Sequence, residues 1–141
     1  MNTTELELNI AKHANPLTGL PGNLVIEEKL RENINLESFA IIYVDLDNFK
    51  AYNDVYGFEN GDQVLLATAS ILSQSLANLD SGEIFLGHIG GDDFFISTTK
   101  ENVEALSQNI IQKFESKKMS FYSEQDKRRG HIIAKSRQGS I

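Results

Sequence analysis

The tetrapeptide Gly90-Gly91-Asp92-Asp93 places two carboxylates side by side between the short apolar runs 84–89 and 94–96. Two glycines between such runs predict a β-hairpin with a tight turn, because glycine adopts positive φ angles without steric cost. Adjacent aspartates are unfavourable there, since like charges repel and aspartate is a poor strand former. We therefore expect this turn to bind a divalent cation that carries a phosphate.

A second acidic pair, Asp45 and Asp47, follows the apolar run 39–44. This continuous β-rich run predicts a central strand buried on both faces. Because the hairpin should pair beside that strand, carboxylates from both places can converge at one edge of the sheet. Such oxygen ligands suit Mg²⁺, which usually binds one or two carboxylates plus substrate phosphates. Asp47 could equally be the N-cap of the next helix, and both interpretations stay open.

Helices must position these acids. Turn formers at 15–23 predict an ordered loop, and the apolar spacing predicts helices at 23–34, at 48–55, from Asp62 to 79 and after a capping box at 98–101. Gly57 and Gly61 are expected to break the chain before the long helix. A β-like segment at 131–134 comes last. The pattern predicts an α+β sandwich, with helices flanking a mostly antiparallel sheet.

The composition limits the classes of function. The chain has 141 residues, enough for one domain with a single core, and 20 acidic against 13 basic residues give a net charge of −7. An acidic surface repels nucleic-acid backbones and anionic membranes, so we expect neither a nucleic-acid polymer nor a membrane as partner. The absence of cysteine excludes disulfides and thiolate metal sites. Without a signal pattern, the expected location is the cytoplasm.

Four stretches, in this order and spacing, closely resemble the GGDEF domain of bacterial diguanylate cyclases. They are Asn15-Pro16-Leu17-Thr18-Gly19-Leu20-Pro21, Asp45-Leu46-Asp47-Asn48-Phe49-Lys50-Ala51-Tyr52-Asn53-Asp54, Tyr56-Gly57-Phe58-Glu59-Asn60-Gly61-Asp62 and Gly90-Gly91-Asp92-Asp93-Phe94. The resemblance covers residues 14 to about 130. We expect residues 1–14 to form a leader or linking helix and residues 15–141 to form the domain.

The resemblance implies a fold like the nucleotidyl-cyclase and polymerase palm, a ferredoxin-like sandwich. It also implies condensation of two GTP molecules into cyclic di-GMP, with Mg²⁺ or Mn²⁺ as cofactor. A product with two-fold symmetry implies a homodimer as the active species, controlled by an upstream sensor domain.

The same resemblance assigns roles to individual residues. The metal ligands are Asp45, the backbone carbonyl of Leu46, and Asp92. Asp92 and Asp93 are the catalytic residues, with Asp92 near the attacking 3′-hydroxyl. The guanine readers are Asn53 and Asp62, since a carboxylate and an amide can pair with the edge of guanine. The phosphate-binding residues are Asn48, Phe49, Lys50, Gly90 and Gly91. From the residues alone, Asn53 and Asp62 could simply satisfy turns around the nearby glycines, and His88 is interpreted as a surface strand residue.

Two departures from the family bear on activity. Asp93 stands where the family usually has glutamate, and its shorter side chain could lose contact with a metal that demands near-ideal octahedral geometry. Family members also continue into a further strand and a helix with cations that clamp the triphosphate. We therefore expect residues 15–141 to lack that strand and helix and to show weak turnover or none. The alternative is a degenerate domain that binds GTP or a protein partner as a regulatory module.

Overall fold

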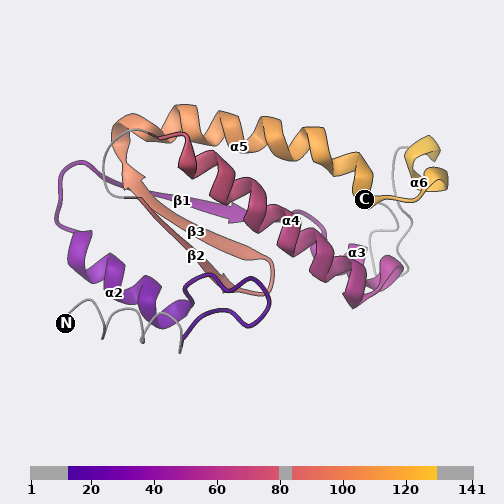
Figure 1. Cartoon of the computed structure of the whole chain (residues 1–141), viewed down its shortest axis with the longest axis horizontal. Coiled ribbons are helices and arrows are strands. Elements are labelled where there is room, and N and C mark those ends of the chain that lie inside the picture. Colours follow the sequence, from indigo (N-terminus) through magenta and orange to yellow (C-terminus); the bar gives the residue numbers. More distant parts are fainter. Residues whose placement is uncertain (1–12, 80–83, 130–141) are drawn as a thin grey trace.

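The computed structural model describes residues 13–79 and 84–129 (Figure 1). Residues 1–12 of the expected leader and the β-like segment at 131–134 lie outside the described residues. The elements, in chain order, are α2 (Asn23–Asn33), β1 (Phe39–Asp45), α3 (Phe49–Tyr56), α4 (Phe58–Ala77), β2 (Phe85–Gly90), β3 (Asp93–Thr99), η1 (Lys100–Asn102), α5 (Val103–Lys118), η2 (Met119–Phe121) and α6 (Glu124–Arg129). The predicted α+β class is confirmed.

The sheet is antiparallel, with the strand order β1-β3-β2. Among the described residues β1 is therefore an edge strand with one exposed face, rather than the expected central strand buried on both faces. Its burial alternates, and Ile41 and Tyr43 on the outer face are 40% and 65% exposed. The composition misled because β-branched and aromatic side chains also suit a half-exposed pleated surface.

Helices cover both faces of the sheet (Figure 1). On one face, α4 and α5 pack against β3 through Leu72, Phe94 and Leu106, which are at most 1% exposed. On the other face α2 lies against β2, where Ile26 closely approaches Gly87. No helix within 13–79 or 84–129 has the length and apolar character needed to span a membrane.

Several helix boundaries differ from the sequence-based expectation. Helix α4 begins at Phe58, so Gly61 lies inside the helix rather than ahead of it. The N-cap of α2 is Gly22, and Asn23 is the first helical residue. The capping box at 98–101 does not form, because η1 comes first and α5 begins only at Val103, without a side-chain cap.

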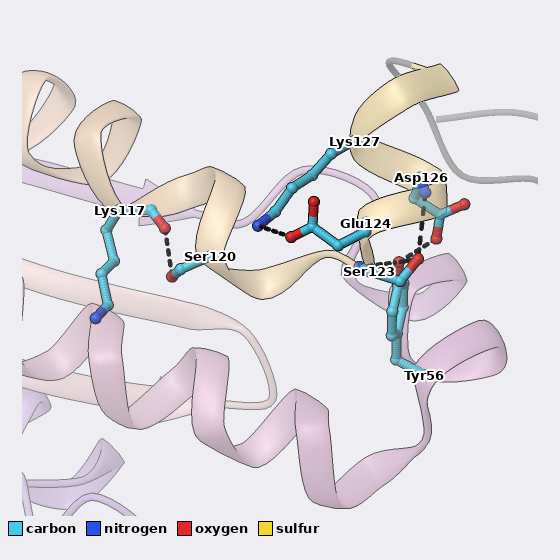
Figure 2. Close-up of polar contacts among 7 residues, drawn as sticks. All are labelled: Tyr56, Lys117, Ser120, Ser123, Glu124, Asp126 and Lys127. Carbon is cyan, nitrogen blue, oxygen red and sulfur yellow. Dashed lines mark hydrogen bonds and ion pairs between the residues drawn. The ribbon is translucent and has the colours of Figure 1, made fainter.

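Helix α6 lies against α3 through polar contacts at Tyr56 (Figure 2). The Tyr56 hydroxyl donates a short hydrogen bond to the Asp126 carboxylate and accepts one from the Ser123 amide at 3.0 Å. Beside it, the Tyr52 hydroxyl donates to the Phe121 carbonyl at 2.6 Å, and the rings of Tyr52 and Tyr56 stack with centroids 4.6 Å apart. These contacts tie α6 and η2 to the helix that follows β1.

Candidate metal and nucleotide site

Three carboxylates meet where β1 ends and β3 begins. Asp45 is the last residue of β1 and lies directly opposite Asp93, the first residue of β3, while Asp92 belongs to the turn between β2 and β3. One oxygen from each of the three lies within 4.8 Å of the others. The expected convergence of the strand-end acid with the hairpin acids is therefore present, and the shorter side chain of Asp93 belongs to the cluster.

The backbone fixes this convergence. The Leu46 amide donates to the Asp92 carbonyl at 3.4 Å, which joins the end of β1 to the turn. Gly91 has a φ of +54°, in the left-handed region that favours glycine. The β2–β3 pairing shifts register between His88 and Gly90, a bulge of the kind that re-aims residues beside functional sites.

The three carboxylates repel one another at neutral pH. A hydrogen bond with the Asp45 side chain, followed by partial burial and the charges of Asp92 and Asp45, raises the pKa of Asp93 above its ordinary value. A divalent cation would relieve this repulsion, because it offsets the charge that the carboxylates bring together. The donor set, three carboxylates close together, fits Mg²⁺ or Mn²⁺, which prefer oxygen ligands.

The candidate phosphate-binding residues flank this cluster. Asn48 is the N-cap of α3, with a φ of +57° and no side-chain cap, so the first amides of the helix are available to an anion. Asp47 is thus not the N-cap, and it lies outside the three-carboxylate cluster. The Lys50 ammonium lies 3.9 Å from Asp54, and both side chains are well exposed, so the pair is weak and can open.

The candidate guanine readers lie where α3 crosses α4. The Oδ1 atom of Asn53 is buried and has no hydrogen-bond partner. It packs against Gly61, where an added Cβ would overlap it. Asp62 is the next residue of α4 and is exposed. The glycine therefore provides a close approach between two helices, which brings Asn53 beside the helical turn that carries Asp62.

A cavity of about 620 Å³ lies at the end of β1. Its walls come from residues 44–49, Tyr52, α4, α5 and the segment from Met119 to Asp126. Lys118 also lines it. Asn53 and Asp62 do not contribute to its lining. The cavity thus shares Asp45 and Asn48 with the site but does not contain the candidate guanine readers.

The sequence interpretation missed His88. This side chain is 2% exposed, so it is a buried residue rather than a surface strand residue. Its ring stacks on Phe94, the residue opposite it in β3. Counting back from the turn could have found it, because His88 shares a face of the sheet with Leu86 and its cross-strand partner Phe94 faces the core.

Comparison with known proteins identifies the family. The family model described as "Diguanylate cyclase, GGDEF domain" matches residues 12–134, and the chain belongs to this family. The bifunctional diguanylate cyclase/cyclic di-GMP phosphodiesterase MucR of Pseudomonas aeruginosa is 32% identical over 94 residues, 63% of this chain and 13% of MucR. The cyclic di-GMP phosphodiesterase PdeR of Escherichia coli is 31% identical over 110 residues, 74% of this chain and 16% of PdeR.

Solved structures agree with the fold. The diguanylate cyclase SiaD of Pseudomonas aeruginosa, in complex with its activator SiaC, superimposes with a TM-score of 0.64 at 27% identity, over 76% of this chain and 43% of SiaD. The expected resemblance and fold are confirmed. The chain spans less than a fifth of MucR or PdeR, at 13% and 16% of their lengths.

Proposed function

We propose that this GGDEF domain binds GTP with Mg²⁺ or Mn²⁺ and, as a symmetric homodimer, joins two GTP molecules into cyclic di-GMP. The observation that carries the proposal is the group of Asp45, Asp92 and Asp93, whose carboxylate oxygens lie within 4.8 Å of one another. Carboxylates at this spacing can share one divalent cation or two neighbouring ones.

The residues of the candidate site have separate roles in this proposal. Asp45, the Leu46 carbonyl and Asp92 hold the cation, which would offset the charge of the triphosphate. The free amides at the start of α3, with Asn48, Phe49 and Lys50, bind the terminal phosphates, because helix N-termini attract anions. Gly90 and Gly91 present backbone rather than side chains to the nucleotide.

The reaction joins the two GTP molecules in two equivalent steps. In each, the 3′-oxygen of one GTP forms a bond to the α-phosphorus of the other, and the bond from that phosphorus to the β-phosphate oxygen breaks, releasing pyrophosphate. The 3′-hydroxyl proton passes to a carboxylate, either Asp92 in the turn or Asp93 at the start of β3. The raised pKa of Asp93 suits a proton acceptor, since basicity increases with pKa.

Asn53 and Asp62 would read guanine. The buried Oδ1 of Asn53 lacks a partner, and an unpaired buried acceptor is unfavourable. A donor on the edge of guanine would satisfy it if the side chain turned this atom toward the nucleotide. The Asp62 carboxylate can accept from guanine N1–H and the exocyclic amine, which adenine does not offer in the same arrangement.

A second candidate is a regulatory domain that binds GTP without turning it over. One observation favours it: the relative PdeR is named a phosphodiesterase rather than a cyclase. Under this candidate the same cluster and guanine readers bind Mg²⁺ and GTP, but no pyrophosphate is released.

The test is to incubate the purified protein with GTP and Mg²⁺ and to measure cyclic di-GMP by mass spectrometry and GTP binding by calorimetry. The cyclase proposal predicts cyclic di-GMP that disappears in Asp45→Asn and persists in Asp47→Asn. Binding of GTP that requires Mg²⁺, without product, would contradict the cyclase proposal and favour the regulatory one. No binding of GTP would contradict both.

A further inference from the structure

We propose that His88 is a positioning residue that couples the loop 13–22 to the turn carrying Asp92. The two ends of its imidazole contact these two segments. The link itself stands on the geometry of the described residues, whereas its consequence for cation binding rests on the proposed function.

The contacts of His88 connect segments far apart in the sequence. Its Nδ1 lies 2.9 Å from the Thr18 hydroxyl and its Nε2 lies 2.9 Å from the Gly91 carbonyl oxygen. The ring stacks on Phe94 with centroids 4.3 Å apart and an interplanar angle of 18°. Buried and stacked, the imidazole has little freedom to adopt another rotamer.

The chemistry of the partners defines the direction of this chain of hydrogen bonds. A carbonyl can only accept, so Nε2 must carry the proton that bonds to Gly91. In a neutral ring Nδ1 then accepts, and the Thr18 hydroxyl donates to it. The same hydroxyl oxygen lies 3.4 Å from the Leu20 amide, which donates to it. Each member of this chain thus holds the next in one orientation.

The turn needs such a contact because the regular strand pairing is interrupted there. The register shift between His88 and Gly90 forms a bulge that interrupts the regular pairing of β2 with β3 just before the turn. The His88 side chain crosses this interruption and holds the Gly91 carbonyl. Since the Gly91–Asp92 peptide is one rigid unit, fixing its oxygen also fixes the amide of Asp92. The Asp92 side chain extends from the residue whose amide is fixed in this way.

The loop 13–22 is itself well braced. The Asn15 Oδ1 accepts from the Leu17 and Thr18 amides at 2.9 and 3.1 Å, and the Asn15 amide donates to the Leu20 carbonyl at 2.8 Å. The loop is fastened to β2 a second time, by the His88 amide donating to the Pro21 carbonyl at 2.9 Å. Figure 1 shows this indigo loop beside the β2–β3 turn. One residue therefore attaches the loop by its backbone and the turn by its side chain.

A histidine that merely filled the core would affect stability alone. A positioning residue also affects the motion of the turn and the geometry of the cation ligands. Substitutions can separate the two nitrogens. In His88→Gln the amide nitrogen can reach the place of Nε2 and still donate to Gly91, whereas in His88→Asn it reaches only the place of Nδ1 and contacts Thr18 at most. Thr18→Val leaves His88 intact and removes the hydroxyl.

The first measurement is the rate of amide hydrogen exchange at residues 91–93, which NMR detects in the metal-free protein. We expect exchange to accelerate about tenfold in His88→Asn, the change that the loss of one hydrogen bond produces. His88→Gln should stay within about twofold of the wild type, and Thr18→Val should accelerate exchange by about three- to tenfold. Thr68→Val is the matched control, since it removes a threonine hydroxyl bonded to the Val64 carbonyl inside α4.

The second measurement is the dissociation constant for Mn²⁺. It should rise by about tenfold in His88→Asn and Thr18→Val, the lower end of the roughly 10–100-fold range for loss of a residue that supports a metal ligand. It should remain unchanged in His88→Gln and Thr68→Val. Unchanged exchange at 91–93 in folded His88→Asn or Thr18→Val would overturn the inference. If the wild type binds no Mn²⁺, the proposed function fails, but the exchange data still decide whether His88 couples loop and turn.

Discussion

Asp45 and Asp93 lie directly opposite each other in the β1–β3 pair, and an oxygen of each carboxyl group lies within 4.8 Å of the other. The register of the sheet thus forces two acids together at the point where the turn adds a third, Asp92. Like charges placed opposite each other in a sheet are unfavourable. Their combined charge is an advantage only if a cation binds.

The first prediction concerns the metal-free protein as a function of pH. Because the pKa of Asp93 is raised in the folded state, the folded state favours the protonated carboxyl. The resulting stability is fully present below the ordinary pKa of about 4 and is lost as the pH rises through the higher folded value. In urea denaturation with EDTA, the free energy of unfolding should therefore decrease with rising pH over a window that starts near pH 4.

Asp93→Asn should flatten this decrease and stabilise the metal-free protein at neutral pH by about 0.2–1 kcal/mol, the range for partly exposed charges. Asp47→Asn is the matched control, because Asp47 is exposed and outside the cluster. Equal pH profiles for Asp93→Asn and the wild type would contradict the electrostatic account.

The second prediction concerns the length of the side chain at position 93. Asp93 lies directly opposite Asp45 in the sheet, and glutamate at this position would carry its carboxylate one methylene further. Since errors of about 1 Å can lower rates by roughly 100-fold, we expect Asp93→Glu to increase any cyclase activity by up to about 100-fold. Release of pyrophosphate measures this. Asp47→Glu should have no effect, and an unchanged or lower rate in Asp93→Glu would refute the argument from reach.

The third prediction concerns the crossing of α3 and α4. A methyl group at Gly61 would overlap the Asn53 Oδ1, so Gly61→Ala should destabilise the protein by about 1–3 kcal/mol and weaken GTP binding. In an Asn53→Ala background the obstacle is gone. There Gly61→Ala should be neutral or stabilise by up to about 1 kcal/mol, because alanine is the better helix former. A double-mutant cycle by chemical denaturation measures the coupling, and additive effects would show that the two residues do not touch.

The fourth prediction concerns α6. Tyr56→Phe removes the hydroxyl that bonds to Asp126 and Ser123 (Figure 2), so it should destabilise by about 1–3 kcal/mol and accelerate amide exchange in α6. Tyr43→Phe is the control, since Tyr43 is 65% exposed, and its effect should stay within about 0.5 kcal/mol. Equal effects of the two substitutions would mean that the contacts of Tyr56 do not anchor α6.

Local sequence signals predicted much of the fold. The hairpin followed from Gly90 and Gly91, because positive φ angles are a property of single residues. The meeting of Asp45 with the hairpin acids followed from the positions of the strand ends. In an antiparallel pair, the last residues of β1 lie opposite the first residues of β3. The family motifs added roles for Asn53 and Asp62, which geometry alone leaves open.

Properties that depend on partners distant in sequence could not be predicted. Glycine usually disfavours a helix interior, and only the close approach of Asn53 explains why Gly61 lies inside α4. The hydrogen bond between His88 and Thr18 joins residues 70 positions apart, and no local pattern in the sequence indicates it. The edge position of β1 among the described strands likewise depends on which strands pair, not on the composition of the run 39–44.

The most direct test of the central claim is Mn²⁺ binding measured by electron paramagnetic resonance, with Mg²⁺ as competitor. Three carboxylates within 4.8 Å predict a saturable site in the wild type. Asp45→Asn should weaken binding by at least about tenfold, since even the loss of a supporting residue costs about 10–100-fold. Asp47→Asn should bind as the wild type does. If Asp45→Asn and Asp47→Asn bind Mn²⁺ equally well, the cluster is not the metal site and the account is contradicted.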